Sequence, residues 1–104
     1  MAAAGRIGSG SAMASRWRRR RMCILVAGDP APAALRTISA SGAFLETGAR
    51  PAPGDRVELR HPEAGAIAAV VRSLAPDGVE LRFPLGEASV AFALAAIAAD
   101  MSRP

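Results

Sequence analysis

Apolar and polar residues alternate along much of the chain, and this alternation predicts short β-strands. In residues 55–60, D-R-V-E-L-R, Val57 and Leu59 occupy one face and charged residues occupy the other. Residues 79–83, V-E-L-R-F, alternate in the same way. Residues 65–74 form a longer apolar run with the character of a buried strand. The second half of the chain is therefore expected to be mainly β.

Three more segments nearer the N-terminus also predict strands. The run M-C-I-L-V-A-G is short and apolar, and Gly28, Asp29 and Pro30 end it. Residues 35–39 and 43–47 form two ribbons separated by a break of Ser and Gly residues. Together with the later segments, they make five or six short strands.

Turn and helix signals complete the expected fold. The sequence A-P-D-G at 75–78 predicts a hairpin turn, because proline presets φ and Gly78 can take a positive φ. Beyond Pro84 the period changes, and residues 87–101 predict a helix. We expect its apolar stripe to pack on the core: Val90, Leu94, Ile97 and Met101. The pattern predicts a small antiparallel barrel closed or flanked by this helix.

The length of 104 residues predicts a single domain. Residues 1–15 are small and polar without a period, so we expect a disordered tail, with Met13 as an alternative start. The domain is expected over 16–101, divided into an arginine arm (16–21), a barrel (22–85) and a helix (87–101). No run approaches the roughly 18 uncharged apolar residues of a membrane span.

The arginine arm and the apolar run after it also have the order of a secretory signal peptide. That run is about as short as the shortest workable h-region, and Asp29 and Pro30 interrupt it before the small residues. Cys23 is the single cysteine, which excludes an internal disulfide and fits a reducing compartment. We therefore expect a cytoplasmic protein.

Charge is distributed unevenly along the chain. All 13 basic residues are arginine, and six of them precede the first acid, Asp29. The remainder carries 7 basic and 9 acidic residues, a net charge of −2. Because a guanidinium matches phosphate oxygens in a two-point fork, the basic head suggests a phosphate-bearing partner.

The inventory of reactive groups argues against an enzyme. His61 is the single histidine, and its position before Pro62 predicts a solvated surface side chain. A nucleophilic Ser39 or Ser41 would need that histidine as its base. Cys23 lies in an apolar run and is expected to be a small core residue. The acids show no metal-ligand spacing, so no metal or cofactor is expected.

Two motifs and several shorter matches follow one another in a recognisable order. Arg16 and Arg20 stand at R-x-x-x-R spacing, and residues 37–42, T-I-S-A-S-G, fill a D/N-x-S-x-x-G segment. Further along come G-x-x-V-x-L from Gly54, the V-R pair Val71-Arg72, and G-V-x-x-x-F from Gly78. This order resembles the PilZ domain family, the bacterial receptors of cyclic di-GMP, over roughly residues 16–90.

The resemblance implies a six-stranded barrel whose mouth is crossed by the arginine segment. In PilZ-like binding Arg16 and Arg20, with Arg19 as a spare cation, would clamp phosphates and guanine edges. Ser39 would bond the ligand, and Gly42 would permit the turn and a close backbone approach. Both also have structural alternatives: Ser39 as a residue that satisfies a turn, and Gly42 as a bulge or a hairpin position with positive φ.

Thr37 departs from the family pattern, which has Asp or Asn at this position. A carboxylate accepts from both N–H groups of the guanine edge, whereas a hydroxyl offers a weaker contact. Hydrogen bonds to charged groups contribute about 1.5–3 kcal/mol against about 1 for neutral ones, a loss of about tenfold in affinity. Some PilZ-like proteins work as protein-interaction modules without a ligand.

Three functions follow from these observations. The leading one is a PilZ-like sensor or adaptor that binds cyclic di-GMP and changes a surface read by an unidentified protein partner. The second is a degenerate PilZ fold that acts only in protein contacts, with the helix at 87–101 as a candidate surface. The third is nucleic-acid binding through the basic arm, against which the mildly acidic body argues.

Overall fold

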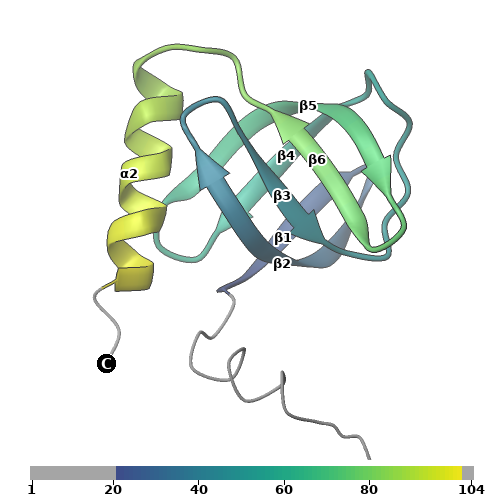
Figure 1. Cartoon of the computed structure of the whole chain (residues 1–104), viewed down its shortest axis with the longest axis horizontal. Coiled ribbons are helices and arrows are strands. Elements are labelled where there is room, and N and C mark those ends of the chain that lie inside the picture. The colour runs from purple at the N-terminus through teal and green to yellow at the C-terminus, as the bar shows by residue number, and fades with distance from the viewer. Residues whose placement is uncertain (1–20, 102–104) are drawn as a thin grey trace, which may run out of the picture.

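The computed structural model describes residues 21–101, which form a closed six-stranded antiparallel barrel and one helix (Figure 1). Around the barrel the strands follow the order β1-β2-β3-β6-β5-β4. The elements are β1 (Arg21–Ala27), β2 (Asp29–Ser39), β3 (Gly42–Glu46), β4 (Arg56–His61), β5 (Gly65–Ala75), β6 (Gly78–Arg82) and α2 (Glu87–Met101). The predicted mainly β barrel with a C-terminal helix is confirmed. The expectations for the tail and for residues 16–20 of the arm lie outside the described residues.

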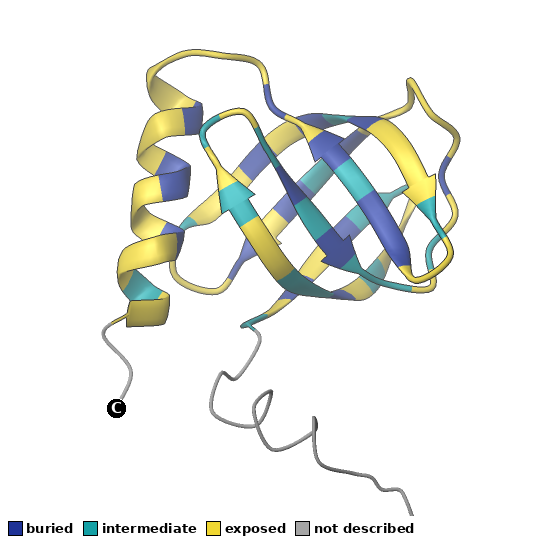
Figure 2. Ribbon diagram, viewed as in Figure 1, coloured by how far each residue is buried: buried dark blue, intermediate teal, exposed yellow. Residues whose placement is uncertain are grey.

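Aliphatic side chains from alternate strand positions fill the barrel (Figure 2). Val57 and Leu59 of β4 point inward, as predicted, and so do Val79 and Leu81 of β6. β5 also alternates instead of being buried on both faces. Its buried residues are Ile67, Ala69 and Val71. The core is therefore a largely aliphatic cluster enclosed by a single closed sheet.

β2 begins earlier than the sequence predicts, at Asp29 instead of residue 35. Gly28 has a φ of +87° and makes a tight turn, so β2 folds back at once along β1. Pro30 and Pro32 are tolerated because β3 pairs with β2 only from Ala34 onward. The first part of β2 thus has one bonded edge, the setting in which a strand accepts proline.

α2 lies across one end of the barrel (Figure 1), and it buries a different face from the one predicted. Phe92 packs edge-on against Phe83, with ring centroids 5.9 Å apart, and joins the core. Small residues on the same face let the helix approach: Ser89, Ala93 and Ala96. The expectation that the Val90, Leu94, Ile97 and Met101 stripe packs on the core is wrong, because all four are exposed.

His61 is buried, at 4% exposure, so the expectation of a solvated histidine is also wrong. Its Nδ1 accepts from the backbone N–H groups of Glu63 and Ala64, both at 3.0 Å, and fixes the turn after β4. Its ring packs edge-on against Phe92. Burial lowers the pKa of His61, and the Arg21 charge lowers it further against the opposing effects of Glu63 and Asp100.

This lowered pKa predicts a loss of stability in mild acid. In the unfolded chain the His61 side chain has an ordinary pKa of about 6.5. In mild acid it therefore binds a proton more readily than the buried side chain of the folded protein does. The free energy of unfolding should therefore fall as the pH drops below about 6.5, by at most about 1.4 kcal/mol per pH unit. Asparagine keeps an acceptor near the position of Nδ1 but does not titrate, so His61→Asn should flatten this slope. Urea unfolding between pH 7.5 and 5.5 measures it, and equal slopes in both proteins would contradict the assignment.

Candidate functional site

A β-bulge in β2 decides which side chains reach the outer face of the barrel. The register with β3 shifts between Leu35 and Thr37, so Arg36 is the extra residue. Since strand side chains alternate, an extra residue moves all later ones to the opposite face. Arg36 and Thr37 are therefore both exposed, Ile38 is half-buried, and Ser39 is exposed again.

A second bulge in β5 lies level with the first. The register with β6 shifts between Val71 and Ser73, so Arg72 is the extra residue and both it and Ser73 are exposed. The strand pairings form one row across four strands: Thr37 with Phe44, Phe44 with Glu80, and Glu80 with Ser73. Thus each bulge places an arginine on the same outer face, beside a hydroxyl residue.

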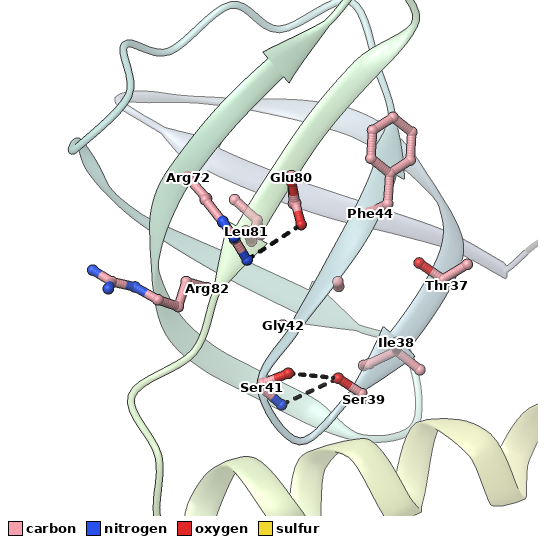
Figure 3. A pocket seen from close by; sticks show the side chains of 11 residues that line it. Thr37, Ile38, Ser39, Ser41, Gly42, Phe44, Arg72, Glu80, Leu81 and Arg82 are labelled. Atoms are coloured by element: carbon pink, nitrogen blue, oxygen red, sulfur yellow. Dashed lines mark hydrogen bonds and ion pairs between the residues drawn. The ribbon is translucent and has the colours of Figure 1, made fainter.

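A pocket of about 470 Å³ lies on this outer face, across β2, β3, β6 and β5 (Figure 3). Its volume is within the range of about 300–1,000 Å³ typical of small-molecule sites. The polar side chains that line it are Thr37, Ser39, Ser41, Arg72, Glu80 and Arg82. The structure therefore brings together Thr37, Ser39 and Gly42, the predicted site residues within the described part of the chain.

Ser39 closes the turn between β2 and β3. Its Oγ accepts from the Ser41 N–H at 3.2 Å and lies 2.9 Å from the Ser41 Oγ. This is the structural role that the sequence left open, and it holds both hydroxyls at the rim of the pocket (Figure 3). Thr37 lines another side of the same pocket.

Arg72, Glu80 and Arg82 are pocket residues that the sequence did not assign to the site. Arg72 Nη1 lies 3.7 Å from the Glu80 carboxylate, which also accepts from the Ser73 hydroxyl at 3.0 Å. The Arg82 side chain extends away from the hairpin turn (Figure 3). Two arginines and one carboxylate line the pocket, but the Arg82 guanidinium points away from the other lining side chains in Figure 3, so Arg72 is the cation placed to meet an anion there.

Arg36 serves the fold and not the pocket. Its guanidinium stacks on the Phe44 ring, 4.4 Å from the centroid. It donates from Nε to Glu46 at 2.7 Å and from Nη2 to both Glu46 and Asp77. The bond from Arg36 lowers the pKa of Asp77, and the same contacts raise the pKa of Arg36. Arg36 therefore ties β2 and β3 to the turn between β5 and β6.

Of the arginine arm, the structure describes only its last residue, Arg21; Arg16, Arg19 and Arg20 lie outside the described residues. Arg21 belongs to β1, donates to the Ala99 carbonyl in the last turn of α2 at 3.4 Å, and lies 3.5 Å from the Glu63 carboxylate. The arm thus enters the barrel beside the end of α2.

The remaining candidates from the sequence are the thiol of Cys23, a metal site and a membrane span. Cys23 is buried in the core, as predicted, and burial raises the pKa of its thiol to about 11. Within residues 21–101, no three His, Cys, Asp or Glu side chains gather as metal ligands. In the same part of the chain no helix has the length and apolar character needed to cross a bilayer.

Comparison with protein families, with curated proteins and with solved structures gives no match for this chain. The resemblance to PilZ domains therefore rests on the order of motifs along the sequence.

Gly42 is required by a close backbone approach and not by a positive φ. A Cβ at this position would lie 2.1 Å from the Leu81 carbonyl oxygen of β6. Gly78, for which a positive φ was expected, is in the same situation, because its Cβ would lie 2.0 Å from the Leu45 carbonyl oxygen. The two glycines let β3 and β6 pair closely at both ends of their ladder, and Gly42 is the one that lines the pocket.

Gly42→Ala should destabilise the barrel by about 1–3 kcal/mol, because neighbouring backbone must shift to admit the methyl group. Gly48→Ala is the matched control, since a Cβ there meets nothing within 4 Å, and we expect no loss of stability. Gly78→Ala should resemble Gly42→Ala although Gly78 does not line the pocket. Chemical denaturation of the three variants measures this, and equal stability of Gly42→Ala and Gly48→Ala would refute the steric role.

Proposed function

We propose that the chain is a PilZ-like receptor that binds cyclic di-GMP on the outer face of its barrel. The observation that carries the proposal is the bulge at Arg36. It places Thr37 and Ser39 on the outer face, where they line one pocket with Gly42 and Arg72. Without that extra residue, strict alternation would direct Thr37 and Ser39 into the barrel.

The course of β1 and β2 supports a contribution from the arginine arm. β1 begins at Arg21 opposite Leu35, and β2 continues four residues further, to Ser39. That continuation spans about 13 Å, at about 3.3 Å per residue. Arg16 precedes Arg21 by five residues, which reach about 17 Å when extended. The arm is therefore long enough for Arg16 to reach a ligand held at Ser39, whereas Arg20, one residue from Arg21, would meet the ligand nearer to Leu35.

The chemistry of the pocket suits a guanine dinucleotide. Guanidinium groups donate to phosphate oxygens and to guanine O6 and N7, and Arg72 adds one such group to those of the arm. Among the described residues that line the pocket, Glu80 carries the one carboxylate. It offers the guanine N–H groups the charged acceptor that Thr37 does not provide, provided that Arg72 turns from Glu80 to the ligand.

In this proposal the protein is a sensor or adaptor without catalysis of its own, working in the cytoplasm. Ligand binding would order the arginine arm and thereby change the surface presented to a protein partner. A nucleotide-free role in protein contacts is the alternative, and binding of nucleic acid by the arm is the third.

Calorimetry with cyclic di-GMP, GMP and a short oligonucleotide separates these functions. We expect saturable binding of cyclic di-GMP alone, abolished in Arg16→Ala/Arg20→Ala and weakened in Ser39→Ala. Strongly salt-dependent oligonucleotide binding would favour the basic-arm alternative. No heat with any of the three would leave the protein-contact function and overturn the receptor proposal.

Arg72 allows a matched test of the pocket itself. Arg72→Ala should weaken cyclic di-GMP binding about tenfold, the loss expected for a charge-assisted contact. Arg60→Ala is the control, because Arg60 is similarly exposed and also pairs with a glutamate, Glu58, but does not line the pocket. Thr37→Asp should restore about tenfold in affinity. Equal effects of Arg72→Ala and Arg60→Ala would place the ligand elsewhere.

A further inference from the structure

The outer face of α2 is apolar along most of its length. From residue 88 to residue 99 every side chain is Ala, Ser, Val, Phe, Leu or Ile. Phe92 and the small residues beside it face the barrel, so the large aliphatic residues remain outside. These exposed residues form a row that we call the α2 stripe: Val90, Leu94, Ile97 and Met101. A surface helix ordinarily presents polar residues on this side.

The C-terminal end of α2 is negative, and the helix has no cation of its own there. Its last turn contains Asp100, which is exposed, and no basic residue. The carbonyl groups at a helix C-terminus add a partial negative charge, so cations are favoured at this end. Arg21 from β1 supplies one, by donating to the Ala99 carbonyl at 3.4 Å. A segment suited to the α2 stripe therefore combines an apolar group with further cations.

We propose that the arginine arm covers the C-terminal half of the α2 stripe, with the Trp17 ring on Leu94 and Ile97. The arm has the required composition, since R-W-R-R-R at 16–20 sets one large apolar ring among four arginines. The ring supplies contact area, and arginine stems can lie along apolar surface while their guanidinium groups stay in water near Asp100. This contact does not depend on the cyclic di-GMP receptor.

The point at which the arm enters the barrel puts the stripe within its reach. Arg21 contacts the last turn of α2. Trp17 precedes Arg21 by four residues, which span up to about 14 Å when extended. Along the helix axis, Ile97 lies about 3 Å from Ala99 and Leu94 about 7.5 Å, at 1.5 Å per residue. Both stripe residues are therefore closer to the start of β1 than the extended arm is long.

Because the arm and α2 belong to one chain, a weak contact suffices. A short connection within one chain gives an effective concentration in the millimolar range, so a contact with a dissociation constant of about 1 mM forms about half of the time. A contact of this strength leaves the arm available to the pocket. A partner that binds the α2 stripe must first displace the arm, which makes the arm an intramolecular cover of the helix.

Trp17 reports on its own contact, because it is the single tryptophan and the chain has no tyrosine. Quenching by acrylamide, which is uncharged, measures how accessible the ring is in the full chain without nucleotide. Leu94→Lys removes apolar contact and repels the arginines. We expect it to raise the quenching constant about twofold, as for the loss of a contact formed about half of the time. Leu94→Ser should act in the same direction without adding a charge, and it serves if Leu94→Lys does not fold.

Leu85→Lys is the matched control, because Leu85 is also an exposed leucine, at 81% against 62% for Leu94, but lies before α2. About 18 Å of helix separates the start of α2 from Ala99, further than the arm extends from Arg21 to Trp17. We expect no change in quenching for this control, and circular dichroism checks that each variant folds.

Equal quenching of the wild-type chain and Leu94→Lys would overturn the proposal, and so would an equal rise in Leu85→Lys. Protection of Trp17 that appears only above about 100 μM protein would also overturn it, because a second copy would then cover the stripe.

Discussion

Side chains in a β-strand alternate between two faces, so one inserted residue changes the face of every residue after it. The barrel contains two such insertions, at Arg36 and Arg72, on either side of the β3–β6 pair. The aliphatic core requires Leu35 and Val71 to face inward, and the bulges then turn the residues that follow toward solvent. The outer pocket therefore forms where strand residues before the bulges face the core and the bulges place the polar residues that follow on the outer face.

The strands themselves follow from the sequence because burial on one face imposes a visible period. β4 and β6 show it plainly, and the structure confirms their inward residues. A bulge cannot be read in this way, because it is defined by two residues opposing one on a partner strand. L-R-T-I-S therefore appears in the sequence as an apolar ribbon with polar interruptions, although the motif that resembles PilZ domains predicted Thr37, Ser39 and Gly42 as site residues. Arg72 belongs to the V-R pair of the motif order, but the sequence assigns it no role in the site. Its place at the pocket depends on which strand pairs with β5.

The sequence predicts the position of α2 correctly but the wrong face of the helix as buried, and the reason is packing geometry. The sequence offers two stripes along α2, one of large aliphatic residues and one of small residues around Phe92. At the barrel end Phe92 packs between the rings of Phe83 and His61, and small neighbours allow the helix to approach. Fit to the opening therefore outweighs the greater apolar area of the other stripe. His61 is buried for a related reason, because its ring closes the same end of the barrel against Phe92.

Arg21 links the features that concern function. It is the residue through which the arginine arm continues into β1, and its guanidinium reaches both Glu63 and the last turn of α2. A closed barrel with a close-packed core has little freedom to transmit a signal, so a signal to α2 would have to change the way the helix packs across the barrel end. A ligand alters such a contact only if it binds two arrangements of the arm with different affinity. The coupling is then reciprocal, so a change in α2 that favoured the ligand-bound arrangement would raise the ligand affinity by the same factor. For a sensor built on this fold, the junction of Arg21 with Ala99 is thus one described contact, beside those of β2 and β5 with α2, through which an event at the pocket would reach the helix.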